Sequence, residues 1–185
     1  MLLVRAKIVQ PDGTNIADAN PIGYMNLWLH SLFSQVDISL NGTQVTTSTN
    51  TYPSSAMIET LLSYGDDTKM SQLTSSLFFK VQPGRMDLVD FADAARNRSR
   101  WNRSRFPRGS LVVDMIGTIH TEIFFQNRYL LNEVNVKIKL VRSRNSFCLM
   151  TANANQFHAK IDSAIMFLRK VKLSQSVFLA HAKTL

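Results

Sequence analysis

Residues 27–50 read LWLHSLFSQVDISLNGTQVTTSTN, and the middle of this stretch decides the fold class. From residue 35, apolar and polar side chains alternate with the period of two that a half-buried β-strand shows. The apolar set is Val36, Ile38 and Leu40, and the polar set is Gln35, Asp37 and Ser39. Asn41-Gly42 follows at once and suits the two positive φ angles of a type I′ hairpin turn. Residues 43–47 are polar and β-prone, so the stretch predicts an antiparallel hairpin.

The same alternation recurs on both sides of this hairpin. It predicts strands at Val4–Ile8, at Val113–Ile123 and at Val134–Leu140. The last such segment, KIDSAIMFLRKVKL (160–173), has an apolar face and an apolar middle on its other face. The apolar face consists of Ile161, Ile165, Phe167, Val171 and Leu173. This pattern predicts a strand that is covered on both faces in its middle.

One segment changes to a helical period. The apolar residues Met57, Ile58, Leu61, Leu62 and Tyr64 predict an amphipathic helix, bracketed by Pro53 and Gly65. The preceding segment 20–35, NPIGYMNLWLHSLFSQ, fits either a short helix or an extended lead-in. Several strands with one helix in a long connection indicate a mainly-β, antiparallel sandwich or barrel.

Length and composition limit the class of protein. A chain of 185 residues is the size of one domain, or of one domain with a tail. The single cysteine, Cys148, excludes an internal disulfide framework, and no apolar run has the ~20 residues that a membrane-spanning helix needs. The formal net charge is +8, which favours an acidic partner such as nucleic acid or an anionic surface.

The residue types that carry catalysis do not form a recognised motif. No two of His30, His120, His158 and His181 have the spacing of a helical zinc site, and no acidic residue completes a ligand set near them in the sequence. Glycine-rich phosphate loops and a GxSxG elbow are absent from the sequence. Cys148 lies in the apolar SFCLM, which favours a buried, inert thiol. The sequence therefore predicts a protein that is not an enzyme, with no cofactor, no metal and no small-molecule substrate.

The segment RNRSRWNRSRFPRGS (96–110) is the part of the chain that most resembles a nucleic-acid contact. Its arginines suit phosphates, and its aromatic side chains could stack on bases. The candidate contact residues are Arg96, Arg98, Arg100, Trp101, Arg103, Arg105 and Arg108. Two other interpretations remain open: a solvated loop neutralised by Asp87, Asp90 and Asp93, or a segment that docks on an acidic partner surface.

Four segments, taken in order, resemble the major capsid protein of Polinton/Maverick-type elements and adintoviruses. They are LWLHSLFSQVDISLNGTQV (27–45), STNTYPSSAMIETLLSYG (48–65), VDMIGTIHTEIFFQNRYLLNEVNVKIKLVRSRNSFCLM (113–150) and IMFLRKVKLSQSVFLAHAKTL (165–185). A strand that ends in an Asn-Gly turn and is followed by a helix is also similar to capsid proteins of large nucleocytoplasmic DNA viruses. The match is weakest at residues 81–110, where the arginine segment departs from the family.

The resemblance implies a double jelly-roll capsid protein, or hexon, that trimerises into pseudo-hexagonal capsomers of an icosahedral virion. Residues 1–175 would form the first, eight-stranded jelly roll, and residues 176–185 would begin the connection to a second one. The implied partners are further copies of the chain, penton or minor capsid proteins and packaged DNA. The implied location is the virion, assembled in the host cell, in the nucleus, without secretion. Two alternatives remain: a basic β-sandwich that binds nucleic acid, and a single jelly-roll, penton-like minor capsid protein.

Overall fold

The chain folds into a mainly-β structure with antiparallel sheets and few helices. The computed structural model describes residues 1–81, 83–84, 97–131, 133–151, 156–177 and 180. The strands are β1 (Leu2–Val9), β2 (Gly23–Tyr24), β3 (Phe33–Leu40), β4 (Thr43–Gln44), β5 (Val113–Gly117), β6 (Val136–Arg142), β7 (Leu149–Met150) and β8 (His158–Met166). The helices are α1 (Trp28–Ser31), α2 (Tyr52–Ser63), α3 (Asp66–Met70), α4 (Arg98–Arg105) and α5 (Asn145–Cys148), with 3₁₀ turns at Gln72–Ser76, Arg108–Ser110 and Glu122–Phe124. The predicted mainly-β, antiparallel class is confirmed.

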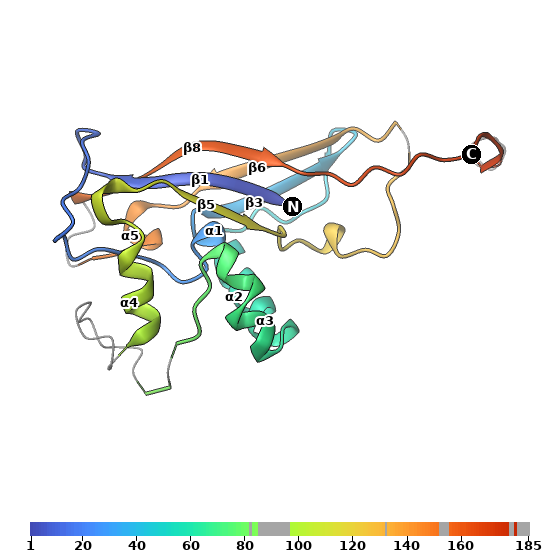
Figure 1. Ribbon diagram of the computed structural model, residues 1–185. Helices are drawn as coiled ribbons and strands as arrows, with labels where there is room; N and C mark the ends of the chain where they lie inside the picture. The colour runs from blue at the N-terminus through green and yellow to red at the C-terminus, as the bar shows by residue number, and fades with distance from the viewer. Residues whose placement is uncertain (82, 85–96, 132, 152–155, 178–179, 181–185) are drawn as a thin grey trace.

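The strands pair in a nested order. One sheet has the order β5-β1-β8, a second the order β4-β3-β6, and β2 pairs with β7 (Figure 1). Every pairing is antiparallel. The first strand of the described chain thus pairs with the eighth, the second with the seventh and the third with the sixth. Chain segments that are far apart in the sequence therefore lie side by side.

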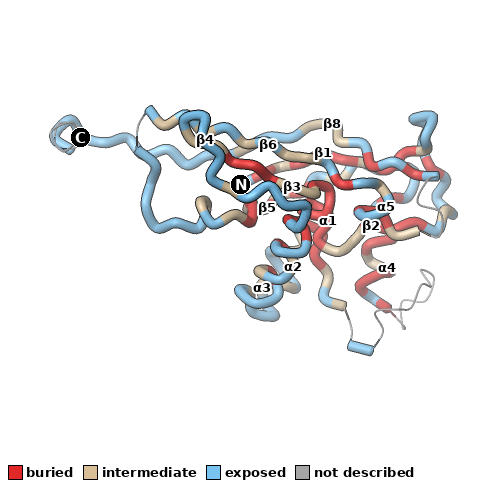
Figure 2. The backbone as a smooth tube through the Cα atoms, turned by 180° about the vertical axis from the view of Figure 1, so that it is seen from behind, coloured by how far each residue is buried: buried red, intermediate tan, exposed pale blue. Residues whose placement is uncertain are grey.

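The two three-stranded sheets share one hydrophobic core. Every second residue of β1 (Leu2, Val4, Ala6 and Ile8) is buried, as the alternation predicts. These side chains belong to the same buried cluster as Val36 and Ile38 of β3. Figure 2 shows that burial is concentrated in β1, β3 and α1, while α3 and the C-terminal segment are exposed.

The hairpin at residues 33–44 forms as the sequence predicts. Asn41 and Gly42 both have positive φ angles, 48° and 84°, which is the requirement of the type I′ turn. The returning strand is shorter than the predicted range 43–47. The hydroxyl of Thr46 accepts the amide hydrogen of Ile38 at 2.9 Å, so a side chain replaces the next backbone partner in the ladder.

The apolar lead-in to β3 is a short helix. Trp28, Leu29 and Leu32 are fully buried, and the Trp28 ring stacks on Tyr24 with the ring centroids 3.7 Å apart. Leu27 has a left-handed backbone with φ 56°, which begins α1 directly after an extended segment. Of the two interpretations of this segment, the short helix is therefore correct for residues 28–31.

The predicted helix near residue 57 exists, but the predicted buried face is wrong. The buried residues of α2 are Tyr52, Pro53, Ala56 and Thr60, and Met57 packs half-buried against Leu27 and Phe78. The small side chains of Ala56 and Thr60 let this face approach the core closely, and most of the predicted apolar face points outward. Ile58, Leu61 and Leu62 are exposed, Leu62 by 82%.

Two strand predictions also need correction. The strand predicted at Val113–Ile123 ends at Gly117, and a 3₁₀ turn follows at Glu122–Phe124. The last strand ends at Met166, and the β1–β8 register shifts between Arg5 and Ala6, which is a β-bulge. A bulge moves later side chains to the other face, so Ile161 and Ile165 do not share a face. Ile165 is 48% exposed, so the prediction of a strand covered on both faces is wrong within this chain.

Candidate functional site

The arginine segment contains a helix, α4, that the sequence did not predict. The side chain of Asn97 accepts a hydrogen bond from the amide of Arg100 at 3.1 Å, which caps the first turn of α4. Arginine is also a good helix former, so the run 98–105 favours a helix once it is capped. Of the predicted contact residues, Arg96 lies outside the described residues.

Arg103 points into the protein. It is only 4% exposed, and its Nη1 donates to the carbonyl oxygen of Tyr24 at 2.9 Å and to Sδ of Met150 at 3.2 Å. Its Nε donates to the carbonyl oxygen of Ser99 at 3.3 Å. Burial, and then the nearby charge of Arg100, lower the pKa of Arg103 to about 10. Arg103 therefore fastens α4 to β2 and β7.

The outer side of the segment carries the accessible charges. Arg98, Arg105 and Arg108 are exposed, whereas Arg100 is buried beside Arg103. The guanidinium of Arg105 lies over the Trp101 ring, 4.7 Å from its centroid, which is a cation–π contact. These three arginines and the half-buried Trp101 are the predicted contact residues that can reach a phosphate or a base. The predicted nucleic-acid contact stays a prediction for them.

A second group of polar side chains, joined by hydrogen bonds and ring contacts, was not predicted from the sequence. Nδ1 of His30 lies 2.8 Å from the Tyr52 hydroxyl, and Nδ1 of His120 lies 2.7 Å from Oε2 of Glu59. The two imidazole rings meet edge to face with their centroids 4.7 Å apart. The group joins α1, α2 and the segment after β5. We call His30, Tyr52, Glu59 and His120 the histidine cluster.

Burial sets the protonation state of His30 and Tyr52, which form the inner half of the histidine cluster. The pKa of His30 falls to about 3, first because the ring is buried and second because of the charge of His120. Burial also raises the pKa of Tyr52 above its ordinary value. At neutral pH His30 is therefore uncharged, and Tyr52 keeps its proton.

The outer half of the histidine cluster borders an open cleft of about 480 Å³. The cleft is lined by Glu59, Glu122, Phe125, Gln126, Asn127 and Arg128. Glu59 belongs to both the cleft and the cluster, so it links a buried polar group to solvent. Within the described residues, no group of three His, Cys, Asp or Glu side chains is arranged to hold a metal ion.

Local spacing could not have revealed the histidine cluster, because its hydrogen bonds join residues far apart in the chain. The sequence separation is 22 residues for His30 and Tyr52 and 61 for His120 and Glu59. The pairing of His120 with Glu59 could therefore not be predicted from the sequence. Of the other histidines, His158 is exposed and His181 lies outside the described residues. Cys148 is buried as predicted, and burial raises the pKa of its thiol to about 11.

No protein-family model, no curated protein and no solved structure matches this chain. In the described part of the chain, no helix combines the length and the apolar character that crossing a membrane requires.

Proposed function

We propose that this protein is a structural capsid subunit built on a jelly roll, and that it assembles with further copies of itself. The observation that carries the proposal is the nested pairing of β1 with β8, β2 with β7 and β3 with β6. An antiparallel ribbon paired in this way and wound on itself is how a jelly roll forms from eight strands. A fully nested order would also pair β4 with β5. Among the described residues, β4 pairs with β3 instead, and β5 pairs with β1.

Exposed apolar side chains support an assembling protein. Soluble monomers rarely expose large contiguous apolar patches, and such patches mark interaction surfaces. Here exposed apolar side chains recur on α2, between residues 125 and 131 and on the segment that follows β8. The sequence resemblance to capsid proteins is a separate line of support. On its basis we further propose that the assembly is a trimeric capsomer of an icosahedral virion.

Self-association tests this proposal directly. Sedimentation of the purified chain over a range of concentrations is expected to give a species near three times the 20.9 kDa of one chain. Electron microscopy of that species is expected to show three-fold particles or shells. A protein that stays strictly monomeric at high concentration would contradict the proposal.

A second function, nucleic-acid binding, is favoured by the exposed side of the arginine segment. If Arg98, Arg105 and Arg108 contact phosphates, changing all three to Gln is expected to reduce the slope of log affinity against log salt by about 2–3 units. The matched control changes Lys7, Lys137 and Lys160 of the sheets to Gln, which removes the same charge elsewhere. Equal slopes for the two triple variants would show that the arginine segment is not the contact.

A further inference from the structure

Helix α2 is attached to the protein through two histidines that lie on other elements. Nδ1 of His30 in α1 lies 2.8 Å from the hydroxyl of Tyr52, the first residue of α2. Nδ1 of His120, in the segment after β5, lies 2.7 Å from Oε2 of Glu59, which comes about two turns later in the same helix. Both hydrogen bonds of the histidine cluster therefore end on α2, so the cluster joins this helix to its neighbours.

The apolar attachment of α2 is small for a helix of 12 residues. Of the residues of α2, all of which the structure describes, only Tyr52 belongs to the main hydrophobic core. Ala56 and the half-buried Met57 pack in a separate small cluster with Leu27 and Phe78. The larger apolar side chains of the outer face of α2 are exposed. The helix therefore contributes little to the core that holds the two sheets together.

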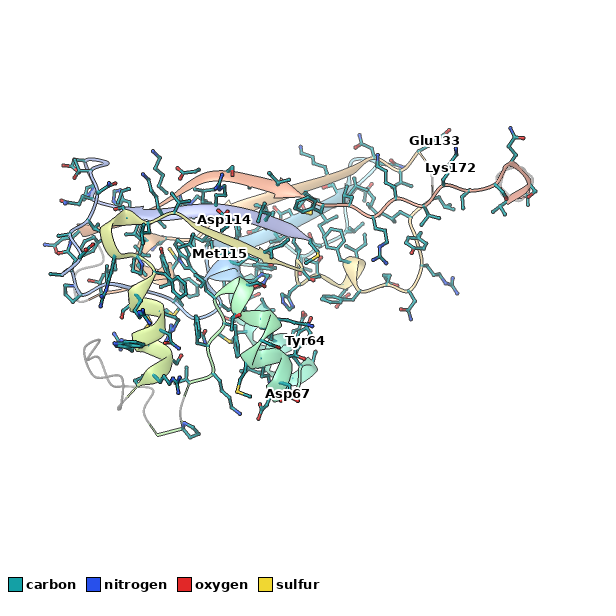
Figure 3. All side chains as sticks on the ribbon, viewed as in Figure 1. Tyr64, Asp67, Asp114, Met115, Glu133 and Lys172 are labelled. Carbon is teal, nitrogen blue, oxygen red and sulfur yellow. The ribbon has the colours of Figure 1, made fainter. Side chains whose placement is uncertain are left out.

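The sequence of α2 also lacks the features that stabilise a helix locally. Its N-cap residue, Thr51, makes no side-chain capping hydrogen bond, and the helix has no acidic residue in its first turn and no basic residue in its last. Figure 3 shows that α2 projects from the sheets, because Tyr64 directly after it and Asp67 of α3 lie well away from Met115 of β5. An isolated helix of this length is only marginally stable in water, and segments with few buried apolar contacts open more easily than a core. We therefore expect α2 to open more easily than the sheets.

The site that α2 covers is unfavourable for a charged His30. The His30 ring is only 2% exposed, and the ring of His120 meets it edge to face with the centroids 4.7 Å apart. Among the described residues, the titratable groups that face the His30 ring are Tyr52 and His120, and Glu59 lies behind His120. Burial, and then the charge of His120, hold the pKa of His30 at about 3. The charged residues of the cleft beyond Glu59 are Glu122 and Arg128.

Separation of α2 would expose the His30 ring to water. In such an open form the ring would take up a proton near its ordinary pKa of 6.5, whereas the closed form resists protonation until the pH falls to about 3. Acidification favours whichever form binds the proton more tightly, which here is the open one. We propose that the histidine cluster makes the attachment of α2 sensitive to pH, so that acidification favours a form in which α2 has separated from α1 and from the segment after β5 while both sheets stay folded.

The size of the effect follows from the two protonation equilibria. Lowering the pH from 7.5 to 4.5 is expected to multiply the ratio of open to closed α2 by about 90. Opening would uncover Leu27 and Phe78, which are buried in one small cluster with Ala56 of α2. Acidification would therefore expose an apolar surface that is hidden at neutral pH. The inference goes beyond the proposed function, because it concerns a change within one chain.

Hydrogen exchange of the wild type at pH 7.5 and pH 4.5 tests the opening. Each exchange rate is divided by the rate of the unfolded chain at the same pH, which gives an opening equilibrium for α2, β1 and β3. The opening equilibrium of α2 is expected to exceed that of both strands at each pH and to rise about 90-fold at pH 4.5. Low concentrations of urea are expected to promote the opening of the strands but hardly that of α2, because a local opening exposes little surface. Equal opening of α2 and the strands at pH 4.5, or an α2 opening that does not respond to pH, would overturn the inference.

Histidine variants identify the ring that causes the response. His30→Asn is expected to lose most of the increase in α2 opening, because the asparagine side chain does not titrate. His158→Asn, at an exposed histidine, is the matched control and is expected to keep the full increase. An increase of the same size in His30→Asn would show that the histidine cluster does not cause the opening.

Thiol labelling gives a second measurement that leaves His30 in place. Thr60 of α2 is fully buried, and Thr60→Cys nearly preserves the size of its side chain. Cys148 lies in the main core, so it reports the opening of the whole domain in the same molecule. A pyridyl disulfide, which reacts with thiols at acidic pH, is expected to label position 60 about tenfold faster than Cys148 at pH 4.5, after correction for the rates in the unfolded chain. Equal corrected rates at the two positions would show that α2 opens only with the whole domain, and the inference would be wrong.

Discussion

Lowering the pH from 7.5 to 4.5 is expected to remove about 3 kcal/mol of folding free energy through His30 alone. The folded protein holds the pKa of this buried ring at about 3, against 6.5 in the unfolded chain. The unfolded state therefore binds the proton more tightly at every pH between these values. The stabilising contribution is fully present well above pH 6.5 and is lost progressively as the pH falls. The loss is about 4 kcal/mol at pH 3 and approaches about 5 kcal/mol at lower pH. This is a large part of the ~5–15 kcal/mol that stabilises a typical domain.

The groups around His30 determine how the loss can be measured. The His30 ring faces the Tyr52 hydroxyl of α2 and the ring of His120, and His120 is paired with Glu59. Protonation of His30 would place a positive charge on a buried ring whose centroid lies 4.7 Å from that of the His120 ring. Urea unfolding at both pH values, for the wild type and for His30→Asn, isolates the effect. The Asn side chain offers Tyr52 an oxygen near the position of Nδ1 and does not titrate.

The difference between the two proteins is the decisive quantity. The wild type is expected to lose about 3 kcal/mol more than His30→Asn on going to pH 4.5. His158→Asn, at an exposed histidine, is the control and is expected to follow the wild type. If His30→Asn and the wild type lose the same free energy, His30 is not held neutral in the folded protein.

Local signals in the sequence predicted the parts of the fold that depend on neighbouring residues. The alternation of β1 and β3 and the Asn41-Gly42 turn were predicted correctly, because a strand period and a turn are set within a few residues. The existence of α2 was also predicted from its period. The orientation of α2 was not predicted, because it depends on which face of the helix fits against the core. In the structure that face carries the small residues Ala56 and Thr60.

Features that depend on distant partners could not be read from the sequence. The bulge that reorients Ile165 arises from the pairing of β8 with β1. The histidine cluster requires α1, α2 and the segment after β5 to meet. The arginine segment is a further example. Its pattern did not show that Arg103 points inward, since that depends on where Tyr24 and Met150 lie.

Arg103→Ala is expected to lower the free energy of unfolding by about 3 kcal/mol. The substitution removes three hydrogen bonds from a charged donor and the packing of the long side chain between α4, β2 and β7. Arg98→Ala and Arg105→Ala change exposed arginines of the same helix and are expected to stay within about 0.5 kcal/mol of the wild type. Urea unfolding at neutral pH measures all three variants.

Arg103→Met separates the charge of this residue from its packing. Methionine keeps an apolar side chain of similar length and carries no charge that must be desolvated. Arg103→Met is therefore expected to lower the free energy of unfolding by about 1 kcal/mol, less than Arg103→Ala does. Arg103→Lys keeps the charge without the planar fork that reaches both Tyr24 and Met150, and its loss is expected to lie between the two. If Arg103→Ala costs no more than Arg105→Ala, the Arg103 side chain is not buried in solution. All the described arginines of α4 would then be candidates for phosphate contact, and the salt-dependence measurement would have to include Arg103.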